Sequence, residues 1–283
     1  MTDLELNLCG IPFAIHIDGP SSAASLEARF GAYRTTRCGL PVLSPPASLR
    51  VTLTEGWRPP RPSAVPFPGA EGEALPDGTV RFFRDHEHVT WDPARRVATA
   101  ERSTRGASPA AYVDVTPIDT PLRLVLSHEL PAQGGVLVHG AGYGDDRGAV
   151  VFLAPSTGGK TTTTRKLPEA NVLSDDQVAL RRIDGVWYAF ALPFVGDYAK
   201  PTTPRVTRLR ALVLLEKSPT LSLTRLGGAR ALVRVMNCVV RFVRGAGGAD
   251  LLALAGDLVG STPVHVLALS RDEPVMPLVE RLL

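Results

Sequence analysis

Apolar and polar positions alternate in short runs over the first part of the chain, which is the pattern of β-strands. Leu4–Ile17 is predicted to form a strand or hairpin, and Ser22–Arg34 a short helix. Further strands are expected at Ser48–Glu55, Thr79–Phe83, His88–Trp91, Val97–Arg102 and Ala111–Val115. Gly56–Gly78 is rich in Pro and Gly and is predicted to be a loop. We therefore expect residues 1–120 to form a small β-rich N-terminal domain.

From residue 121 onward, longer apolar elements with strand and helix spacing follow one another. Asn171–Leu180 is predicted as one strand with two acids set into it, and Tyr143–Arg147 as a polar hairpin turn. Strands are expected at Gly135–Gly140, Ala149–Leu153, Val186–Leu192, Leu209–Glu216, Leu221–Leu226 and His265–Leu269. Helices are expected at Pro121–Leu130, Gly228–Val243, Asp250–Val259 and Pro274–Leu283. The pattern predicts that residues 121–283 form an α/β domain with a mixed sheet.

The most informative motif directly follows the apolar run Ala149–Leu153. It matches the phosphate-loop pattern G-x-x-x-x-G-K-[ST] except that Ala154 stands at the first Gly. Small residues let backbone N–H groups turn inward around phosphate oxygens, Lys adds a positive charge, and Thr adds a hydroxyl for Mg²⁺. The predicted nucleotide contacts are Ala154, Pro155, Ser156, Thr157, Gly158, Gly159, Lys160, Thr161 and Thr162. The alternative is a solvated Gly/Thr turn, because the run Thr161–Thr164 has low intrinsic helix propensity.

A second signal is the acid pair Asp175-Asp176, which interrupts an apolar stretch soon after the loop. Burial of a carboxylate is costly without a partner, and a metal ion or a reacting proton supplies one. The pair is therefore interpreted as functional, with a turn at the end of a strand as the alternative.

Other polar residues have simpler interpretations. His86 and His88 are conceivable as a metal pair, but no nearby residue completes a ligand set. His265 is predicted to be a core histidine with satisfied hydrogen bonds. Arg234, Arg241 and Arg244 are predicted to form the solvated face of one helix.

Composition narrows the class of protein. The net charge of +3 is too small to indicate a nucleic-acid or membrane partner, and 44% hydrophobic residues are ordinary for a globular protein. Three widely spaced cysteines indicate a reducing compartment. The first residues carry acids where a signal peptide needs positive charge, and no run of eighteen apolar residues exists. We expect a cytoplasmic protein.

The order of His139-Gly140, the loop 154–161 and Ser174-Asp175-Asp176 resembles the HPr kinase/phosphorylase family, which shares a fold with phosphoenolpyruvate carboxykinase. The resemblance covers roughly residues 120–270. Ala191–Asp197 looks like a divergent branch of that family, some members of which accompany peptide natural-product genes. The resemblance implies a mixed-sheet P-loop kinase core that uses ATP and Mg²⁺, with a Ser or Thr hydroxyl of a protein or peptide as acceptor.

The resemblance also implies roles for individual residues. Lys160 would hold the β- and γ-phosphates, and Asp176 would accept the proton of the acceptor hydroxyl beside His139. Thr161, Asp175 and Asp197 would be the metal-binding residues. The glycine-rich stretch that characterises the family around its acidic ligand is missing near Asp197, which puts HPr itself and the phosphorylase activity in doubt.

Two other classes of function stay open from the sequence. One is a nucleotide-responsive binding or regulatory module without transfer chemistry, and the other is a small-molecule kinase. The sequence does not distinguish ATP from GTP or pyrophosphate as the donor. A homo-oligomer is possible by resemblance to the hexameric HPr kinases.

Overall fold

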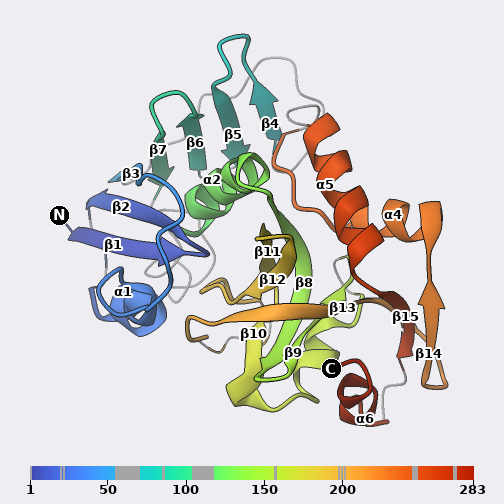
Figure 1. The fold of residues 1–283 in the computed structure, drawn as a ribbon. Coiled ribbons are helices and arrows are strands. Elements are labelled where there is room, and N and C mark those ends of the chain that lie inside the picture. The colour runs from blue at the N-terminus through green and yellow to red at the C-terminus, as the bar shows by residue number, and fades with distance from the viewer. Residues whose placement is uncertain are drawn as a thin grey trace. The chain divides into compact units, whose positions relative to one another are not determined.

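The computed structural model describes residues 2–19, 21, 23–54, 71–84, 87–103, 118–155, 158–196, 198, 200, 202–243, 248–269 and 273–283. The chain divides into two compact units, which are treated separately below (Figure 1). Unit 1 comprises Met1–Glu129 and Arg241–Gly248, and unit 2 comprises Leu130–Val240 and Ala249–Leu283. The division thus falls inside a helix rather than at residue 120, and a later segment returns to unit 1. The mixed α/β class predicted from the sequence is confirmed.

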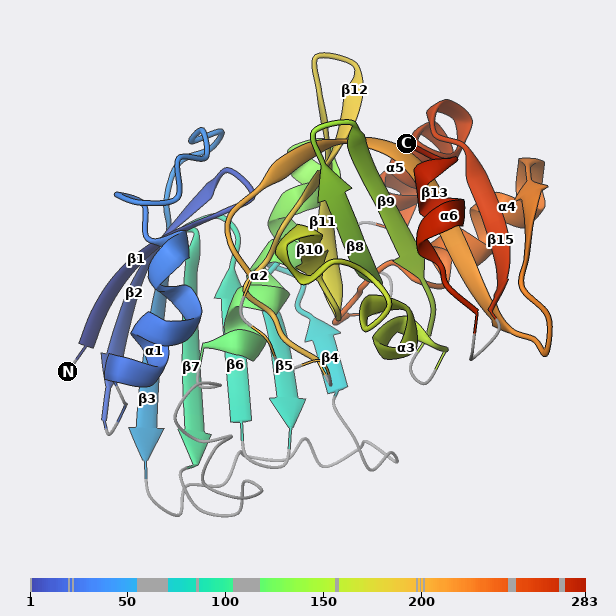
Figure 2. The same ribbon diagram turned by 90° about the horizontal axis from the view of Figure 1, so that it is seen from below.

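Unit 1 is built on a seven-stranded mixed sheet. Its strands are β1 (Thr2–Leu8), β2 (Ile11–Asp18), β3 (Ala47–Thr54), β4 (Glu71–Ala74), β5 (Val80–Arg84), β6 (Glu87–Asp92) and β7 (Val97–Ser103). Figure 2 shows them side by side in the order β1-β2-β3-β7-β6-β5-β4. The β2–β3 and β3–β7 pairs are parallel and the others antiparallel. The turn between β1 and β2 has positive φ at both Cys9 and Gly10, as tight hairpin turns need.

Two helices lie against one face of this sheet (Figure 2). They are α1 (Ala23–Phe30), followed by the 3₁₀ turn Gly31–Tyr33, and α2 (Asp119–Ala132). Arg29 Nη2 donates to Asp119 Oδ2 at 2.5 Å, and Arg96 pairs with Glu129. Burial raises the pKa of Asp119, and the neighbouring Arg29 opposes this shift. The ion pairs join both helices to unit 1.

Unit 2 contains an eight-stranded mixed sheet. Its strands are β8 (Gly135–Asp145), β9 (Gly148–Leu153), β10 (Val172–Ser174), β11 (Gln177–Ile183), β12 (Val186–Phe190), β13 (Val206–Lys217), β14 (Ser222–Leu226) and β15 (Val264–Leu269). The first half of β8 pairs with β11 and its second half with β9. β13 likewise passes from β12 to β9. Because β11 also pairs with β12, five strands follow one another in a closed order.

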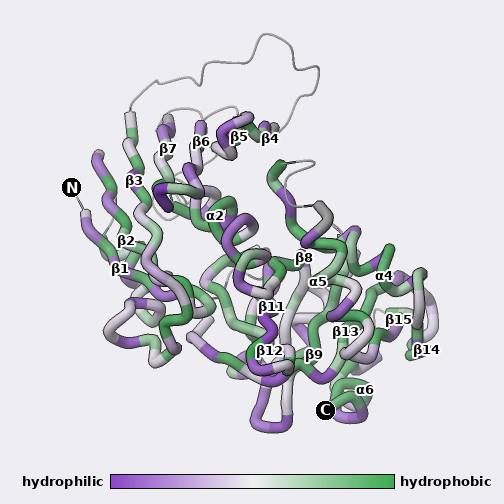
Figure 3. The backbone as a smooth tube through the Cα atoms, turned by 45° about the horizontal axis from the view of Figure 1, so that its top comes forward, coloured by the Kyte–Doolittle hydropathy of each residue, from purple (hydrophilic) through white to green (hydrophobic). Residues whose placement is uncertain are grey.

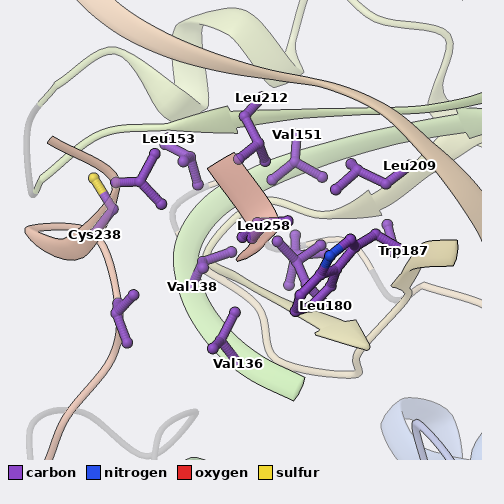
Figure 4. Packing of buried hydrophobic residues seen from close by; sticks show 14 of the residues in the cluster. Val136, Val138, Val151, Leu153, Leu180, Trp187, Leu209, Leu212, Cys238 and Leu258 are labelled. Carbon is purple, nitrogen blue, oxygen red and sulfur yellow. The ribbon is translucent and has the colours of Figure 1, made fainter. Parts of the chain in front are cut away.

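Helices cover this sheet on two sides. They are α3 (Lys160–Thr164), α4 (Gly228–Met236), α5 (Gly248–Ser261) and α6 (Met276–Glu280), with a 3₁₀ turn at Glu169–Asn171. One buried cluster joins α4 and α5 to the strands, and Figure 4 shows Val138 of β8 and Leu258 of α5 within it. A second cluster joins α6 to the other side of β9 and β13. All of β9 is buried, and Figure 3 shows it in the hydrophobic colour.

Some elements differ from the sequence prediction. The strand β4 lies inside the predicted loop Gly56–Gly78, because it is paired with β5. β8 continues to Asp145 through the predicted turn Tyr143–Arg147, because β9 and β10 pair with it there. The predicted strand Ala111–Val115 and residues 56–70 lie outside the described residues.

Two further predictions were wrong. Asn171–Leu180 is broken at Asp175 and Asp176, so that β10 and β11 pair with different halves of β8. The helix predicted over Gly228–Val243 ends at Met236, because Val239 bridges to Val138. Arg234 of α4 pairs with Glu216 at 2.7 Å. Arg241 lies outside the helix, and Arg244 lies outside the described residues.

No helix within the described ranges is long and apolar enough to cross a membrane. The three cysteines, all of them among the described residues, are buried and form no disulfide. His88 stacks on Phe83 with ring centroids 4.6 Å apart, and its predicted partner His86 lies outside the described residues.

His265 occupies β15 as predicted, but its Nδ1 is buried without a hydrogen-bond partner, so the prediction of a satisfied histidine was wrong. Burial lowers the pKa of His265, and Arg225 on the adjacent strand β14 acts in the same direction. The neutral ring is therefore favoured in the folded state.

This lowered pKa predicts a pH-dependent stability. Below the ordinary histidine pKa of about 6.5, the unfolded chain binds a proton that folded His265 resists, so the free energy of unfolding should fall as the pH falls from 6.5 toward 5. Urea unfolding at several pH values checks this. His265→Gln should make the profile below pH 6.5 less steep, and burial of His88 and His128, which also lowers their pKa, should leave part of the slope. An unchanged slope in that variant would contradict the assignment.

Candidate functional site

The loop after β9 begins where a buried parallel strand ends. β9 runs parallel to β13, and the chain then turns so that the N–H of Gly158 donates to the carbonyl of Pro155 at 3.1 Å. α3 starts at Lys160, two residues later. Ser156 and Thr157, two of the predicted contacts, lie outside the described residues. The sequence of strand, tight turn and helix is the context that a phosphate loop requires.

Both glycines of the loop are required by its geometry. A Cβ on Gly158 would lie 2.6 Å from the Cβ of Ala154, which is too close for any side chain. Gly159 has φ = 101°, a left-handed conformation that favours glycine. Its Cβ would also lie 3.0 Å from Cδ2 of Leu269. Glycine at both positions therefore lets the loop fold tightly against Ala154 and Leu269.

The side chain of Lys160 is buried and points back into the loop. Its Nζ donates to the carbonyl oxygens of Ala154, at 3.1 Å, and Pro155, at 3.0 Å. The ammonium thus lies inside the turn that the loop makes.

The four threonines of α3 fall into two pairs. The hydroxyls of Thr163 and Thr164 are buried and donate to the carbonyls of Gly159 and Lys160, each at 3.0 Å. Such bonds satisfy the hydroxyls within the helix. Thr161 is half-buried and Thr162 is exposed, and neither hydroxyl bonds to a described residue. Of the four threonines, these two have hydroxyls left for a ligand.

The acid pair lies at the same end of the sheet as the loop. Gly140 of β8 pairs with Leu153, the last residue of β9, and its N–H donates to the carbonyl of Asp176 at 3.0 Å. One β8 residue therefore separates Asp176 from the strand that leads into the loop. Gly140 is also where β8 changes its partner from β11 to β9, and a Cβ there would lie 2.8 Å from the carbonyl oxygen of Phe152.

His139 completes a dyad with Asp176. Nε2 of His139 lies 3.3 Å from Oδ1 of Asp176, and both side chains are partly exposed. The main-chain N–H of His139 donates to the carbonyl of Cys238 at 2.7 Å. The structure thus brings together the predicted pair His139 and Asp176 near the end of β9.

Asp175 is in a different environment. Its side chain is buried, Oδ1 accepts the N–H of Gly196 at 2.9 Å, and Oδ2 accepts the N–H of Tyr198 at 2.8 Å. Among the described residues, no three His, Cys, Asp or Glu side chains are grouped as metal ligands. Asp197, the third predicted metal-binding residue, lies outside the described residues.

Two residues that the sequence analysis did not select also lie here. Burial raises the pKa of the Cys238 thiol, while the charges of Lys160 and Arg234 oppose that shift. Figure 4 shows Cys238 at the edge of the core cluster, on the side of Leu153. Gln177 is directly opposite His139 in the β11–β8 pair, and its Oε1 is buried without a partner. A polar residue at the start of an apolar strand was the available signal.

The unpartnered oxygen of Gln177 predicts a stabilising substitution. Met has nearly the same volume and no polar atom, so Gln177→Met should raise the free energy of unfolding by about 1 kcal/mol. Gln133→Met is the matched control, because Oε1 of Gln133 accepts a hydrogen bond from Arg181 at 3.0 Å. Loss of that bond should lower the free energy of unfolding by about 1 kcal/mol. Urea unfolding measures both. Equal effects of the two substitutions would contradict the assignment.

A surface hollow of about 720 Å³ lies elsewhere in unit 2. Its lining includes Arg182, Leu254 and Asp257, but no residue of the loop or the acid pair. Asp257 is already bonded to Arg182 at 3.1 Å and to Nε1 of Trp187 at 2.9 Å. Arg182 and Asp257 are thus used in fixing α5 to β11 and β12.

A scan against models of known protein families finds no match, and a search of curated proteins finds no related sequence.

Proposed function

We propose that the protein is an ATP-dependent kinase that transfers a phosphoryl group to a hydroxyl, with a Ser or Thr of a protein or peptide as the acceptor. The observation that carries the proposal is the position of Gly140. Gly140 pairs with Leu153 of β9, the strand that leads into the loop, and its N–H donates to the carbonyl of Asp176. A phosphate-binding element and a proton acceptor at one end of a sheet are what phosphoryl transfer needs.

The residues present fit a nucleotide triphosphate. The loop keeps its tight turn because both glycines lack a side chain, and Lys160 places a positive charge inside that turn. Such an arrangement suits the β- and γ-phosphates. Thr161 has its hydroxyl left for Mg²⁺. Mg²⁺ keeps several waters and needs only one or two protein ligands besides phosphates, so a cluster of three acids is not required.

Bound Mg·ATP would supply an electrophilic phosphorus whose developing charge the loop and Lys160 draw off. Asp176 would orient the attacking hydroxyl and accept its proton. His139 is placed to hold the Asp176 carboxylate in one orientation, through the contact between Nε2 and Oδ1. The resemblance to the HPr kinase family implies these roles, and the links from Leu153 through Gly140 to Asp176 and His139 are consistent with them.

The proposal is tested with ATP labelled on the γ-phosphate. The purified chain, Mg²⁺ and extract of the parent cells should give label in acid-precipitable protein or peptide, as an acid-stable phosphoester. Label that stays in small molecules would indicate a small-molecule kinase. Nucleotide binding without any transfer would indicate a regulatory module, and either outcome would contradict the proposal.

A further inference from the structure

The segment that follows β12 is hydrogen-bonded to β10 and to Asp175, which comes directly after β10. The N–H of Leu192 donates to the carbonyl of Leu173 at 3.3 Å, and the hydroxyl of Ser174 donates to the carbonyl of Phe194 at 3.3 Å. Leu192 and Phe194 are fully buried. We name the described residues 192–196 and 198 the side segment. Its first residues are thus hydrogen-bonded to the two residues of β10 that precede Asp175.

Asp175 makes the last described attachment. Its two carboxylate oxygens accept the N–H groups of Gly196 and Tyr198, at 2.9 and 2.8 Å. Bonds from N–H to an ionised carboxylate are the stronger kind, and here they occupy both oxygens of a side chain that is only 4% exposed. Each oxygen keeps a second lone-pair site, but the burial of the side chain leaves a hydrated Mg²⁺ little access to it.

Gly196 shows how near the side segment lies to the proposed proton acceptor. A Cβ on Gly196 would lie 3.0 Å from Oδ2 of Asp175 and 3.3 Å from the Cβ of Asp176. The main chain of Gly196 thus lies directly against both acids. The side segment therefore borders the Asp176 side chain at its base.

We propose that Asp175 is a positioning residue and not a magnesium ligand. It holds the side segment as one wall of the acceptor site beside Asp176, and so limits the access of water to that carboxylate from this side. The inference depends on the proposed kinase function, because it assigns the wall to the acceptor of that reaction.

Hydrogen exchange of a peptide spanning the side segment tests the attachment. In Asp175→Asn one oxygen is replaced by a donor that cannot accept an N–H, and in Asp175→Ala both are lost. Exchange of the amides of Gly196 and Tyr198 should rise by about 10-fold in Asp175→Asn and by about 100-fold in Asp175→Ala. Asp176→Asn is the matched control and should leave this exchange unchanged. Asp175→Glu keeps the charge but lacks room beside Gly196, so its exchange should also rise.

Two functional readouts separate a wall from a metal ligand. With a fluorescent ATP analogue, Asp175→Asn should change neither the dissociation constant nor the Mg²⁺ concentration for half-maximal binding by more than about twofold. Hydrolysis of ATP, in which water is the acceptor, should increase by about threefold or more because the wall is loosened. If Asp175 bound the metal, Asp175→Asn would instead raise the Mg²⁺ concentration for half-maximal binding and lower the rate of hydrolysis.

The outcomes separate this inference from the kinase proposal. Absence of ATP binding in the unsubstituted chain would overturn the proposed function. Binding with unchanged amide exchange in Asp175→Asn would overturn the inference alone. Raised exchange with unchanged or lowered hydrolysis would make Asp175 a fold anchor or a metal ligand, and would overturn it as well.

Discussion

Lys160→Ala is expected to lower the affinity for Mg·ATP by about 100-fold. The ammonium is the one charged group that the phosphate loop places inside its own turn, and bonds from charged donors contribute about 1.5–3 kcal/mol each. The two carbonyls that it binds belong to buried Ala154 and exposed Pro155, so the variant should lose about 1 kcal/mol of stability and stay folded. Equilibrium titration with a fluorescent ATP analogue measures the change, and far-ultraviolet circular dichroism checks the fold.

Lys166→Ala is the matched control for this experiment. Lys166 lies just beyond α3, and its Nζ donates to the carbonyl of Glu273 at 2.7 Å in an exposed position. The control should bind Mg·ATP like the unsubstituted chain. Equal losses in both variants would mean that general charge, and not the loop, attracts the nucleotide.

Asp176→Asn is expected to reduce phosphoryl transfer by about 10²–10⁴-fold with nucleotide affinity changed by less than about twofold. A positioned general base contributes a factor of this size, and Asn has the same shape but cannot accept the proton. Single-turnover transfer from labelled ATP measures the rate, and the fluorescent titration measures the affinity.

Asp184→Asn controls for the loss of one negative charge. Asp184 is exposed in the turn between β11 and β12 with φ = 49°, a conformation that Asn also tolerates. This variant should keep full transfer. Loss of nucleotide affinity together with transfer in Asp176→Asn would instead assign Asp176 to metal binding.

The strand, turn and helix around Lys160 were predictable from the sequence because their signal is local. An apolar run ending at Leu153 and the residues Gly159-Lys160-Thr161 are contiguous, and the structure shows the strand, turn and helix that they indicate. Glycine at 158 and 159 is dictated by contacts within the same loop or nearby. Local chemistry of this kind does not depend on the rest of the fold.

The surroundings of the acid pair were not predictable in the same way. The break at Asp175 arises because β8 changes partners at Gly140, which is a long-range property of the sheet. The early end of α4 at Met236 has a similar cause, since Val239 bridges to Val138. Periodicity reports which face of an element is apolar, and it carries no information on which strand will pair with it.

The different roles of two adjacent acids also required the structure. Sequence treats Asp175 and Asp176 alike, and both were assigned to the reaction or its metal. In the structure, Asp175 is buried against two amides of a segment about twenty residues later, while Asp176 contacts His139. Tertiary contacts alone decide which of the two acids bonds to the main chain and which stays accessible to a ligand.

The most direct measurement is the hydrogen-exchange footprint of a non-hydrolysable ATP analogue with Mg²⁺ on the unsubstituted chain. The account predicts that protection concentrates in peptides covering residues 154–165 and 174–178. Protection confined to the hollow around Arg182 and Asp257, or no protection at a saturating concentration of the analogue, would contradict it.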